Sequence, residues 1–533
     1  MTSTFPVGLA GSWRRLVAVF VIGVALMAVG SACGLVGWWI GVAAGTVVAA
    51  AVLVKWRGAP LLTLAAMRVH PAATLGGPPR PAADHDRTFG AGPVGIRSVG
   101  THLVAVVAVD GPPHSPSVLV HHQVEAAATL PLGVVAAGLR QYDMTLDGID
   151  VVSAGVRVAS KTHHHHAPVY GARVGDHPAV GQRRTWLVLR LDAAKSVSAI
   201  LWRESVAAAM AAAAEQVAQR LTSLRIPARV LSAAQISEVD EVLLAGADLN
   251  GLRRRWGRLW HAGGYVQTYW VSPRDISTAA IDRLWVPDTD ATAVTVQLRP
   301  TPDGGTAVGV LVRYHTGGPM CEPPLTGLNP LTGRHDHAMA AGLVSPIGGL
   351  IVPSRRLRDG EQLATPIGAS GMIVGTTPAG HPLLIDLAAP TGTATVTIAG
   401  ELALVVQVAV RAAATGYRVV VNTTRPERWR QLTAAGLQLV GPDGLGARLP
   451  ASVHPWLVLY DETSGPTPHG AAVVVRSVDS DAGTGDIHIE QVDDRSAVIH
   501  TRAFRSRLRI GLEHERHLAI DVSPMAMAVT VSV

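Results

Sequence analysis

Cysteine and aromatic residues are scarce in this chain. Of its 533 residues, two are cysteines and four are phenylalanines. Cys33 follows a long apolar run and Cys321 lies in a Pro/Gly-rich stretch. Two such thiols cannot form a disulfide framework, which excludes a small secreted fold held together by disulfides. The core must therefore be built from small aliphatic side chains, in which the sequence is rich.

An excess of one charge is also missing from most of the chain. The first 70 residues contain five of the 45 Lys and Arg residues and no Asp or Glu, so the remainder has 40 basic and 39 acidic side chains. The formal net charge of +6 therefore belongs mainly to the N-terminal segment. A nearly neutral chain lacks the basic face of a general nucleic-acid binder, so we predict no nucleic-acid partner.

Recognisable catalytic motifs are absent as well. The sequence contains no HExxH or CxxC motif and no Ser/His/Asp nucleophile motif. Its nearest approach to an enzyme is the outline of a phosphate-binding loop in the C-terminal part. There the stretch TGTATVTIAG at 391–400 leads into a helical pattern at 401–415, and a later apolar strand at 456–462 ends in Asp461 and Glu462.

The residues of that loop do not fit a phosphate. A phosphate-binding loop needs GxxxxGK[ST], in which Lys neutralises the phosphate and the hydroxyl holds magnesium. Aligned on Gly400, the first glycine position holds Thr395, the Lys position Glu401 and the hydroxyl position Leu402. A carboxylate there repels phosphate. We therefore predict a non-enzyme with no catalytic residues and no cofactor, whose C-terminal domain is at most a degenerate nucleotide-binding α/β fold.

What the chain does contain begins with an uncharged run at residues 16–54. One membrane-spanning helix needs roughly 20 apolar residues, so this run predicts two spans, at about 16–32 and 38–54. Basic residues flank the run and none lies in the turn. Basic flanks stay in the cytoplasm, so we predict an inner-membrane hairpin with both termini cytoplasmic. A signal peptide is the alternative interpretation.

Glycines recur within the uncharged run. Gly37, Gly41 and Gly45 are four residues apart, which places them on one face of the second predicted helix. Helices in lipid associate through small residues that let their backbones approach. We therefore predict these three glycines as a transmembrane packing face. A glycine-rich composition without a packing role is the alternative.

The remaining chain predicts α/β or α+β cytosolic domains behind the hairpin. Short β-branched runs such as THLVAVVAVD at 101–110 alternate with helical patterns, of which the Ala-rich stretch 202–224 is the strongest. Pro/Gly-rich stretches mark the boundaries. The predicted organisation is a hairpin at 1–57, a juxtamembrane segment and linker at 58–93, a first domain at 94–315, a linker at 316–360 and a second domain at 361–533.

Two kinds of candidate binding residues stand out. The densest basic cluster comprises Arg253, Arg254, Arg255 and Arg258. It predicts a contact with a partner protein or anionic lipid headgroups, with a solvated helix face as the alternative. Histidines cluster at 163–166 and at 335–337, but neighbouring residues of a strand point to opposite faces, and a loop triplet lacks further ligands. We predict no metal site.

Four stretches of the soluble region resemble the EccE family, a membrane component of the ESX (type VII) secretion systems of mycobacteria. The stretches are TWLVLRLD at 185–192, RESVAAAMAAAAEQVAQRL at 203–221, PARVLSAAQI at 227–236 and YVQTYWVSPRDISTAAIDRLWVPDTDATAVTVQLRP at 265–300. Their order behind a two-span anchor carries the resemblance, which covers about residues 15–315. Residues 360–533 look like the extension of longer members.

The resemblance implies a non-catalytic structural subunit of the inner-membrane secretion complex. Its implied partners are EccB, EccC and EccD, together with membrane lipids, and EccC is the ATPase of such a complex. No catalytic residues carry over. Two other hypotheses stay open: a membrane-anchored enzyme, such as a degenerate ATPase or a transferase, and a membrane-tethered scaffold outside secretion. A working phosphate or metal site would favour the enzyme, and co-purification with unrelated proteins would favour the scaffold.

Overall fold

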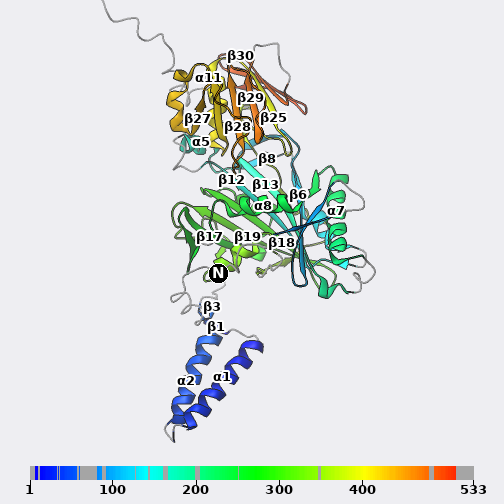
Figure 1. Ribbon diagram of the computed structural model, residues 1–533, viewed down its shortest axis with the longest axis vertical. Coiled ribbons are helices and arrows are strands. Elements are labelled where there is room, and N and C mark those ends of the chain that lie inside the picture. The colour runs from blue at the N-terminus through cyan, green and yellow to red at the C-terminus, as the bar shows by residue number, and fades with distance from the viewer. Residues whose placement is uncertain are drawn as a thin grey trace, which may run out of the picture.

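The chain forms an N-terminal helical hairpin, a first lobe and a second lobe, which follow one another along the long axis of the molecule (Figure 1). The structure is a computed structural model. It describes residues 7–9, 13–32, 34, 37–56, 59–60, 81–86, 92–126, 128–141, 144–159, 166–197, 204–249, 251–345, 350–478 and 485–511.

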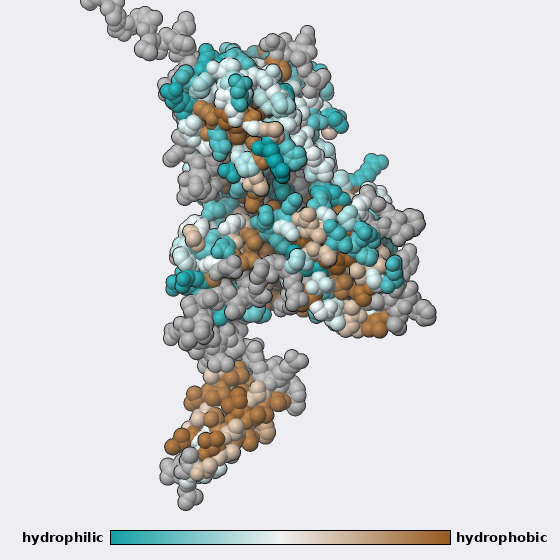
Figure 2. Space-filling model, viewed as in Figure 1, coloured by the Kyte–Doolittle hydropathy of each residue, from teal (hydrophilic) through white to brown (hydrophobic). Residues whose placement is uncertain are grey.

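The hairpin consists of α1 (Trp13–Ala32) and α2 (Gly37–Leu53). The short strands β1 (Val7–Leu9), β2 (Val54–Trp56) and β3 (Ala59–Pro60) form a small antiparallel sheet at its open end. Apolar side chains cover its outside, including Phe20 at 71% exposure and Ile40 at 66% (Figure 2). Among the residues that the structure describes, no helix combines the length and the apolar character required of a membrane span.

The first lobe is built on a 13-stranded antiparallel sheet with the main order β15-β16-β17-β19-β18-β12-β13-β6-β5-β4, to which β14, β20 and β21 add pairs. The bounds of its strands are β4 (Ala83–His85), β5 (Val94–Val99), β6 (His102–Val109), β12 (Gly148–Val156), β13 (Gln182–Asp192), β14 (Ala228–Val230), β15 (Arg253–Arg255), β16 (Arg258–His261), β17 (Gly264–Val271), β18 (Ala291–Pro300), β19 (Thr306–Thr316), β20 (Leu328–Pro330) and β21 (Arg355–Arg356).

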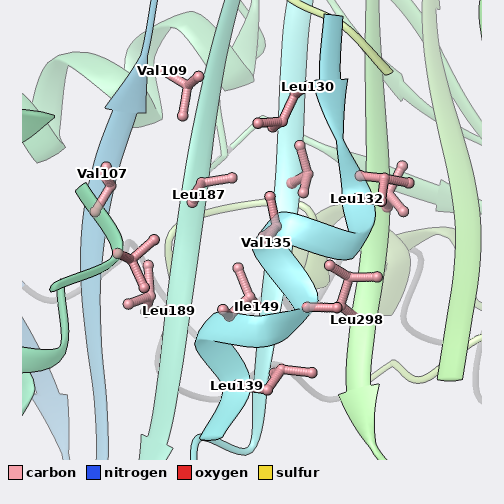
Figure 3. Close-up of a cluster of buried hydrophobic side chains, with 14 of the residues drawn as sticks. Val107, Val109, Leu130, Leu132, Val135, Leu139, Ile149, Leu187, Leu189 and Leu298 are labelled. Carbon is pink, nitrogen blue, oxygen red and sulfur yellow. The ribbon is translucent and has the colours of Figure 1, made fainter. Parts of the chain in front are cut away.

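Both faces of this sheet are buried. In β6, Val107 points into the core under α7 (Val206–Ser223), whereas Val106 points into the core under α8 (Ala233–Leu244). Figure 3 shows the first of these cores, where Leu187 and Ile149 of the sheet lie beside Val135. Because both faces are covered, the sequences of these strands are continuous apolar runs and do not alternate between apolar and polar residues.

Capping residues start the two long helices of this lobe. Ser205 accepts a hydrogen bond from the backbone N–H of Ala208, and Ser232 and Gln235 form a capping box. The other elements are short: α4 (Leu132–Ala136), η1 (Ala137–Leu139), β10 (Arg140–Gln141), β11 (Met144–Thr145), η2 (Ala193–Lys195), η3 (Pro273–Asp275), α9 (Thr278–Arg283) and α10 (His335–Ala341).

The second lobe is built on a 12-stranded sheet in the order β27-β26-β28-β29-β25-β30-β31-β32-β23-β24-β7-β8. The part from β27 to β30 is parallel and the rest is antiparallel. Its elements are β7 (Pro116–Val120), β8 (Gln123–Ala126), β23 (Met372–Thr376), β24 (Pro382–Ile385), β25 (Ala394–Ala399), α11 (Leu402–Ala414), β26 (Arg418–Thr423), η4 (Pro426–Arg428), η5 (Arg430–Ala435), β27 (Leu437–Val440), β28 (Trp456–Asp461), β29 (Ala471–Ser477), β30 (Ile487–Asp493), β31 (Ser496–Thr501) and β32 (Arg505–Arg509).

The two lobes exchange segments of chain. Strands β7 and β8 precede most of the first sheet in sequence but pair into the second one, and β9 (Thr129–Pro131) pairs with β22 (Ala364–Pro366). Helix α5 (Ala167–Val174) packs on the second lobe, and the backbone N–H of Ala159 donates to the carbonyl of Ala414 at 2.8 Å. These long-range links hold the lobes against each other.

The mixed α/β class predicted from the sequence is confirmed. A nucleotide-binding fold finds no support in the structure. Residues 316–360, the predicted linker, carry β20, α10 and β21, which pack on the first sheet. The domain boundaries stay a prediction.

Candidate functional site

A cleft of about 1390 Å³ lies between the two lobes. Its first wall consists of the ends of β12 and β19, the start of β18 and the β16–β17 turn. Its second wall consists of the turn between α11 and β26, the start of β26 and the loop 452–455. Pockets for small ligands measure roughly 300–1000 Å³, so this cleft has room for a longer occupant.

Two polar side chains at the end of β19 are buried in the cleft wall without a partner. His315 is 5% exposed, and neither of its ring nitrogens has a hydrogen-bond partner among the described residues. The hydroxyl of Thr316 is also buried and has no hydrogen-bond partner among the described residues. Buried polar atoms are nearly always hydrogen-bonded, so these atoms are exceptions among the described residues.

The protonation state of His315 is fixed by its surroundings. Burial lowers its pKa well below the usual value for histidine, and Arg313 and His261 lower it further. The imidazole is therefore neutral at pH 7, with one nitrogen that donates a hydrogen bond and one that accepts.

Glycine and a second buried histidine shape the neighbouring turn. His261 accepts a hydrogen bond through Nδ1 from the backbone N–H of Gly263 at 3.2 Å. Burial lowers the pKa of His261, against the opposite effect of Asp248. Gly264 has a φ of +139°, and a Cβ there would lie 2.4 Å from the carbonyl oxygen of Thr316. Only glycine allows this close approach, which leaves backbone at the surface of the cleft.

The charged residues that line the cleft balance one another. Arg184 and Arg418 are matched by Asp288 and Asp290. The guanidinium of Arg418 also lies 4.5 Å from the ring centroid of Trp456, where a cation–π contact positions it. The cleft is therefore nearly neutral in formal charge.

The basic cluster predicted from the sequence forms a β-hairpin, so the alternative of a solvated helix face is wrong. Strands β15 and β16 pair with Arg255 opposite Arg258. Arg254 forms an ion pair of 2.8 Å with the fully buried carboxylate of Asp336, and the guanidinium of Arg258 lies 5.5 Å from the ring centroid of Tyr265. Arg253 and Arg255 are exposed. The cluster thus divides into two packed and two surface-exposed arginines.

The triplet at 335–337 has a structural role. His335 accepts a hydrogen bond from the backbone N–H of Thr268 at 3.2 Å, and burial lowers its pKa to about 4. Asp336 is held by Arg254. Of the other histidine cluster, residues 163–165 lie outside the described residues, and His166 precedes α5.

One group of potential metal ligands exists among the described residues, and a lysine already lies within it. The group comprises His102, Asp147 and Asp192. The ammonium of Lys195 lies 2.5 Å from a carboxylate oxygen of Asp147 and 3.7 Å from one of Asp192. A cation would have to displace Lys195, so these residues are better explained as an ion-pair network.

The glycine face of α2 lies against α1 of the same chain. A Cβ at Gly41 would lie 2.6 Å from the backbone oxygen of Leu26, and one at Gly45 would lie 3.5 Å from the Cα of Gly23. Gly37 is the first residue of α2. The close approach that the glycine spacing predicts therefore occurs within the hairpin.

The loop that resembles a phosphate-binding loop is occupied by a side chain. It connects β25 to α11, and the backbone N–H of Glu401 donates to the side-chain oxygen of Gln491 at 2.9 Å. A Cβ at Gly400 would lie 2.8 Å from the same oxygen. Gln491 thus binds the backbone donor that a phosphate would need.

Asp461, at the end of β28, is equally engaged within the protein. It accepts hydrogen bonds from the hydroxyl of Thr423 at 2.8 Å, the guanidinium of Arg425 at 2.6 and 3.0 Å, and the indole of Trp429 at 2.7 Å. Burial alone would raise the pKa of Asp461, but these hydrogen bonds, led by those of Arg425, lower it overall. These hydrogen bonds connect Arg425 and Trp429, which flank η4, to the end of strand β28.

Sequence reasoning missed the cleft itself. Its lining comes from segments scattered between residues 154 and 455, so no local motif indicates it. The one available signal was Arg313 and His315 at alternate positions of the otherwise apolar strand TAVGVLVRYHT. Polar residues on one face of a buried strand indicate either an internal partner or a site.

The fold defines a two-lobed mixed α/β protein with an N-terminal helical hairpin and a cleft between its lobes. Residues 179–271, which run from β13 to β17, match the family described as "Putative type VII ESX secretion system translocon, EccE".

Full-length relatives agree with this match. The chain is 37% identical over 387 residues to the ESX-5 secretion system protein EccE5 of Mycobacterium tuberculosis, which covers 68% of this chain and 95% of the relative. EccE5 of Mycobacterium marinum is 35% identical with the same coverage. The ESX-2 secretion system protein EccE2 of Mycobacterium tuberculosis is 26% identical over 92% of this chain and 94% of the relative. The chain belongs to the EccE family.

Proposed function

We propose that the chain is a structural component of an ESX type VII secretion system at the cell envelope. The observation that carries the proposal is the 37% identity to an ESX-5 EccE5 protein across 95% of that relative. Arg425 already donates to the carboxylate of Asp461, and the backbone N–H of Glu401 after Gly400 already donates to Gln491. Because neither group is free to bind a ligand, they favour a structural over a catalytic role.

The proposal includes a membrane anchor made of α1 and α2, with two spans and both termini in the cytoplasm. Its support is the absence of charge over residues 16–54, the basic residues on both flanks and the apolar exterior of the hairpin (Figure 2). Apolar side chains that are exposed in a bare chain are stable in contact with lipid.

The proposed partners are the membrane components EccB, EccC and EccD. Cytosolic contacts with them, or with anionic lipid headgroups, are assigned to the exposed Arg253 and Arg255, because their neighbours Arg254 and Arg258 are engaged internally. Exposed arginines can form bidentate hydrogen bonds with carboxylates or phosphates.

The test is purification of the tagged full chain in mild detergent from its own host. We expect EccB, EccC and EccD to co-purify. Recovery of the chain alone, or with proteins unrelated to secretion, would contradict the structural proposal. The double variant Arg253→Ala with Arg255→Ala is expected to weaken co-purification, whereas Arg274→Ala, at another exposed arginine, serves as the control.

The anchor has a separate test. Gly41→Leu places a side chain against the backbone of α1, whereas Gly23→Leu adds the same hydrophobicity where a Cβ meets nothing within 4 Å. We expect both variants to enter the membrane fraction, but Gly41→Leu alone to lose most of its recovery with the complex. The exposed Cys321 should react with a membrane-impermeant reagent only after lysis, and its labelling in intact cells would reverse the proposed topology.

A further inference from the structure

We propose that one face of the three-stranded meander β15–β17 binds an acidic segment of a partner protein. This surface, termed the arginine face, consists of Arg253, Arg255, Arg258, Trp260 and Tyr265. The proposal deepens the proposed function and rests on it, because it narrows the contacts assigned to Arg253 and Arg255 to one class of partner.

The strand register places these five side chains on one side of the sheet. Arg253 is paired with Trp260, which is paired in turn with Tyr265, and Arg255 is paired with Arg258. Residues that are paired across antiparallel strands point to the same side, as do residues two apart within one strand. The three arginines and the two aromatic rings therefore form one continuous surface.

The opposite side of the same strands is packed, so the arginine face cannot turn inward. Leu259 and Val266 are fully buried in one core cluster. On the arginine face, Arg253 and Arg255 are exposed and Trp260 is 36% exposed. A shift of the register by one residue would expose the apolar side chains and bury the arginines, so the core fixes the orientation of the face.

No acidic side chain of the meander balances the arginine face. Residues 249–274 contain five arginines and no Asp or Glu. Within the part of the chain that the structure describes, Arg253, Arg255 and Arg258 form no ion pair. A cation–π contact with Tyr265 instead holds the guanidinium of Arg258 on the face. The face therefore attracts negative charge, and carboxylates are suited to it because arginine binds them through paired hydrogen bonds.

The position of the face favours a protein over membrane lipid. Trp260 and Tyr265 line the cleft, so the face lies at the end of the first lobe that borders the second lobe. The hairpin lies beyond the opposite end of the first lobe (Figure 1). Strand β19, whose last residue pairs with Tyr265, has 11 residues and spans roughly 35 Å. This length is several times the Debye length of about 8 Å, so headgroups around the hairpin are too distant.

The residue types also favour a protein over a nucleic acid. Arg, Trp and Tyr are enriched among the side chains that dominate binding energies at protein interfaces. Nucleic-acid binding draws on many phosphate contacts, of the order of 6–10, whereas the face has three arginines. Asp288 and Asp290 line the neighbouring cleft, so the acidic segment is placed along the arginines and outside the cleft.

The test uses a photo-crosslinking amino acid, benzoylphenylalanine, in place of Ala262 in the full chain expressed in its own host. Ala262 is exposed in the turn between β16 and β17, beside the arginine face but not part of it. After irradiation we expect an adduct with a second protein, joined within a stretch that has a net negative charge. An adduct with lipid, with nucleic acid, with another copy of this chain or with a neutral or basic stretch would overturn the proposal, as would no adduct.

Charge reversal tests whether the arginines make the contact. The double variant Arg253→Glu with Arg255→Glu changes two exposed positions, and we expect it to lower the adduct yield at least tenfold. Arg274→Glu reverses the charge of another exposed arginine outside the face and should leave the yield unchanged. Replacing the acidic residues of the captured segment by Lys should restore the yield of the double variant. Equal yields in the double variant and the control, or no restoration, would overturn the proposal.

Trp260 tests the aromatic part of the face. We expect Trp260→Ala to lower the adduct yield about tenfold, as a loss of 1.4 kcal/mol in binding would. Ile351→Ala, at an apolar side chain that is 69% exposed elsewhere on the first lobe, should leave the yield unchanged. The unfolding midpoint of each variant is measured beside its yield. Equal yields in two variants that both stay folded would contradict the role of Trp260.

Co-purification with EccB, EccC and EccD separates this proposal from the proposed function. If the crosslinking chain enters the complex and forms no adduct, the arginine face is refuted and the proposed function stands. If the unsubstituted chain does not co-purify with the complex, the proposed function itself is refuted.

Discussion

The two lobes differ in how completely the polar groups at two places, the strand ends of the second lobe and the cleft wall of the first, are hydrogen-bonded. In the second lobe, the strand ends at Gly400 and Asp461 lie where open α/β sheets usually bind ligands, at the carboxyl ends of parallel strands. There Gln491 and Arg425 already bind the available atoms. In the first lobe, the side-chain polar atoms of His315 and Thr316 are buried beside the cleft and have no hydrogen-bond partner in the part of the chain that the structure describes.

This contrast shows that the fold class alone does not determine where a ligand-binding site lies. The parallel sheet has the topology of many ligand-binding domains, yet its strand ends are closed by the protein's own side chains. The antiparallel sheet contains the buried polar atoms that lack a hydrogen-bond partner among the described residues. Substitutions in each lobe can test this contrast, and the largest effect is expected at Asp461.

Removal of the carboxylate of Asp461 should strongly destabilise the second lobe. Asp461→Ala leaves the indole of Trp429 and the guanidinium of Arg425 without their acceptor, and breaking such a buried pair typically costs about 3–5 kcal/mol. The measurement is hydrogen exchange of the β26 and β28 amides in the purified full chain. Glu462→Ala, which removes the 57%-exposed carboxylate that also pairs with Arg425, should cost at most about 1 kcal/mol. Equal losses of hydrogen-exchange protection in Asp461→Ala and Glu462→Ala would show that the hydrogen bonds of Asp461 do not stabilise this strand end.

In the first lobe, Asp282→Asn should stabilise the protein at neutral pH. Burial raises the pKa of Asp282 to about 6, although Arg183 acts to lower it. The folded chain therefore holds a proton that the unfolded chain has lost between about pH 4 and 6, so stability falls as the pH rises through this window. We expect a gain on the order of 1–2 kcal/mol at pH 7 and none at pH 4 in urea unfolding. Asp359→Asn, at an exposed site, is the control, and a pH-independent gain would rule out the titration of Asp282 as the cause.

Two buried histidines of the first lobe should differ in their contribution to stability. His335→Leu removes the acceptor of the Thr268 N–H and should cost about 1–2 kcal/mol. His315→Leu removes no hydrogen bond that the described residues make, so its free energy of unfolding should stay the same or rise. The measurement is urea unfolding of both variants at pH 7. A loss at His315 as large as that at His335 would mean that a partner within the chain satisfies it.

The smallest effect is expected at the loop before α11. Gln491→Ala exposes the N–H of Glu401 to water, which should cost no more than about 0.5 kcal/mol because the site is exposed. It should not create ATP binding in calorimetry, since Glu401 still occupies the Lys position. ATP binding by Gln491→Ala, but not by the parent chain, would identify the second lobe as a masked nucleotide site.

Local patterns predicted the elements of the fold well. The Ala-rich stretch 202–224 is largely α7, and the apolar pattern at 401–415 is α11. Both follow from helical periodicity, which is a property of neighbouring residues. The basic cluster at 253–258 was less predictable, because its structure depends on pairing with β17 and on the distant Asp336.

The sequence by itself determined the uncharged N-terminal run, the two long helices, the apolar strands and the lack of a Lys at the phosphate-loop position, since each depends on residues within one short stretch. Its resemblance to EccE was confirmed by relatives that align along most of the chain. Only the tertiary structure decided that β7 and β8 join the second sheet, that Gln491 and Arg425 close its strand ends, and that a cleft forms around His315. These features depend on contacts between residues far apart in the chain, and such pairings leave no periodic signal in the sequence.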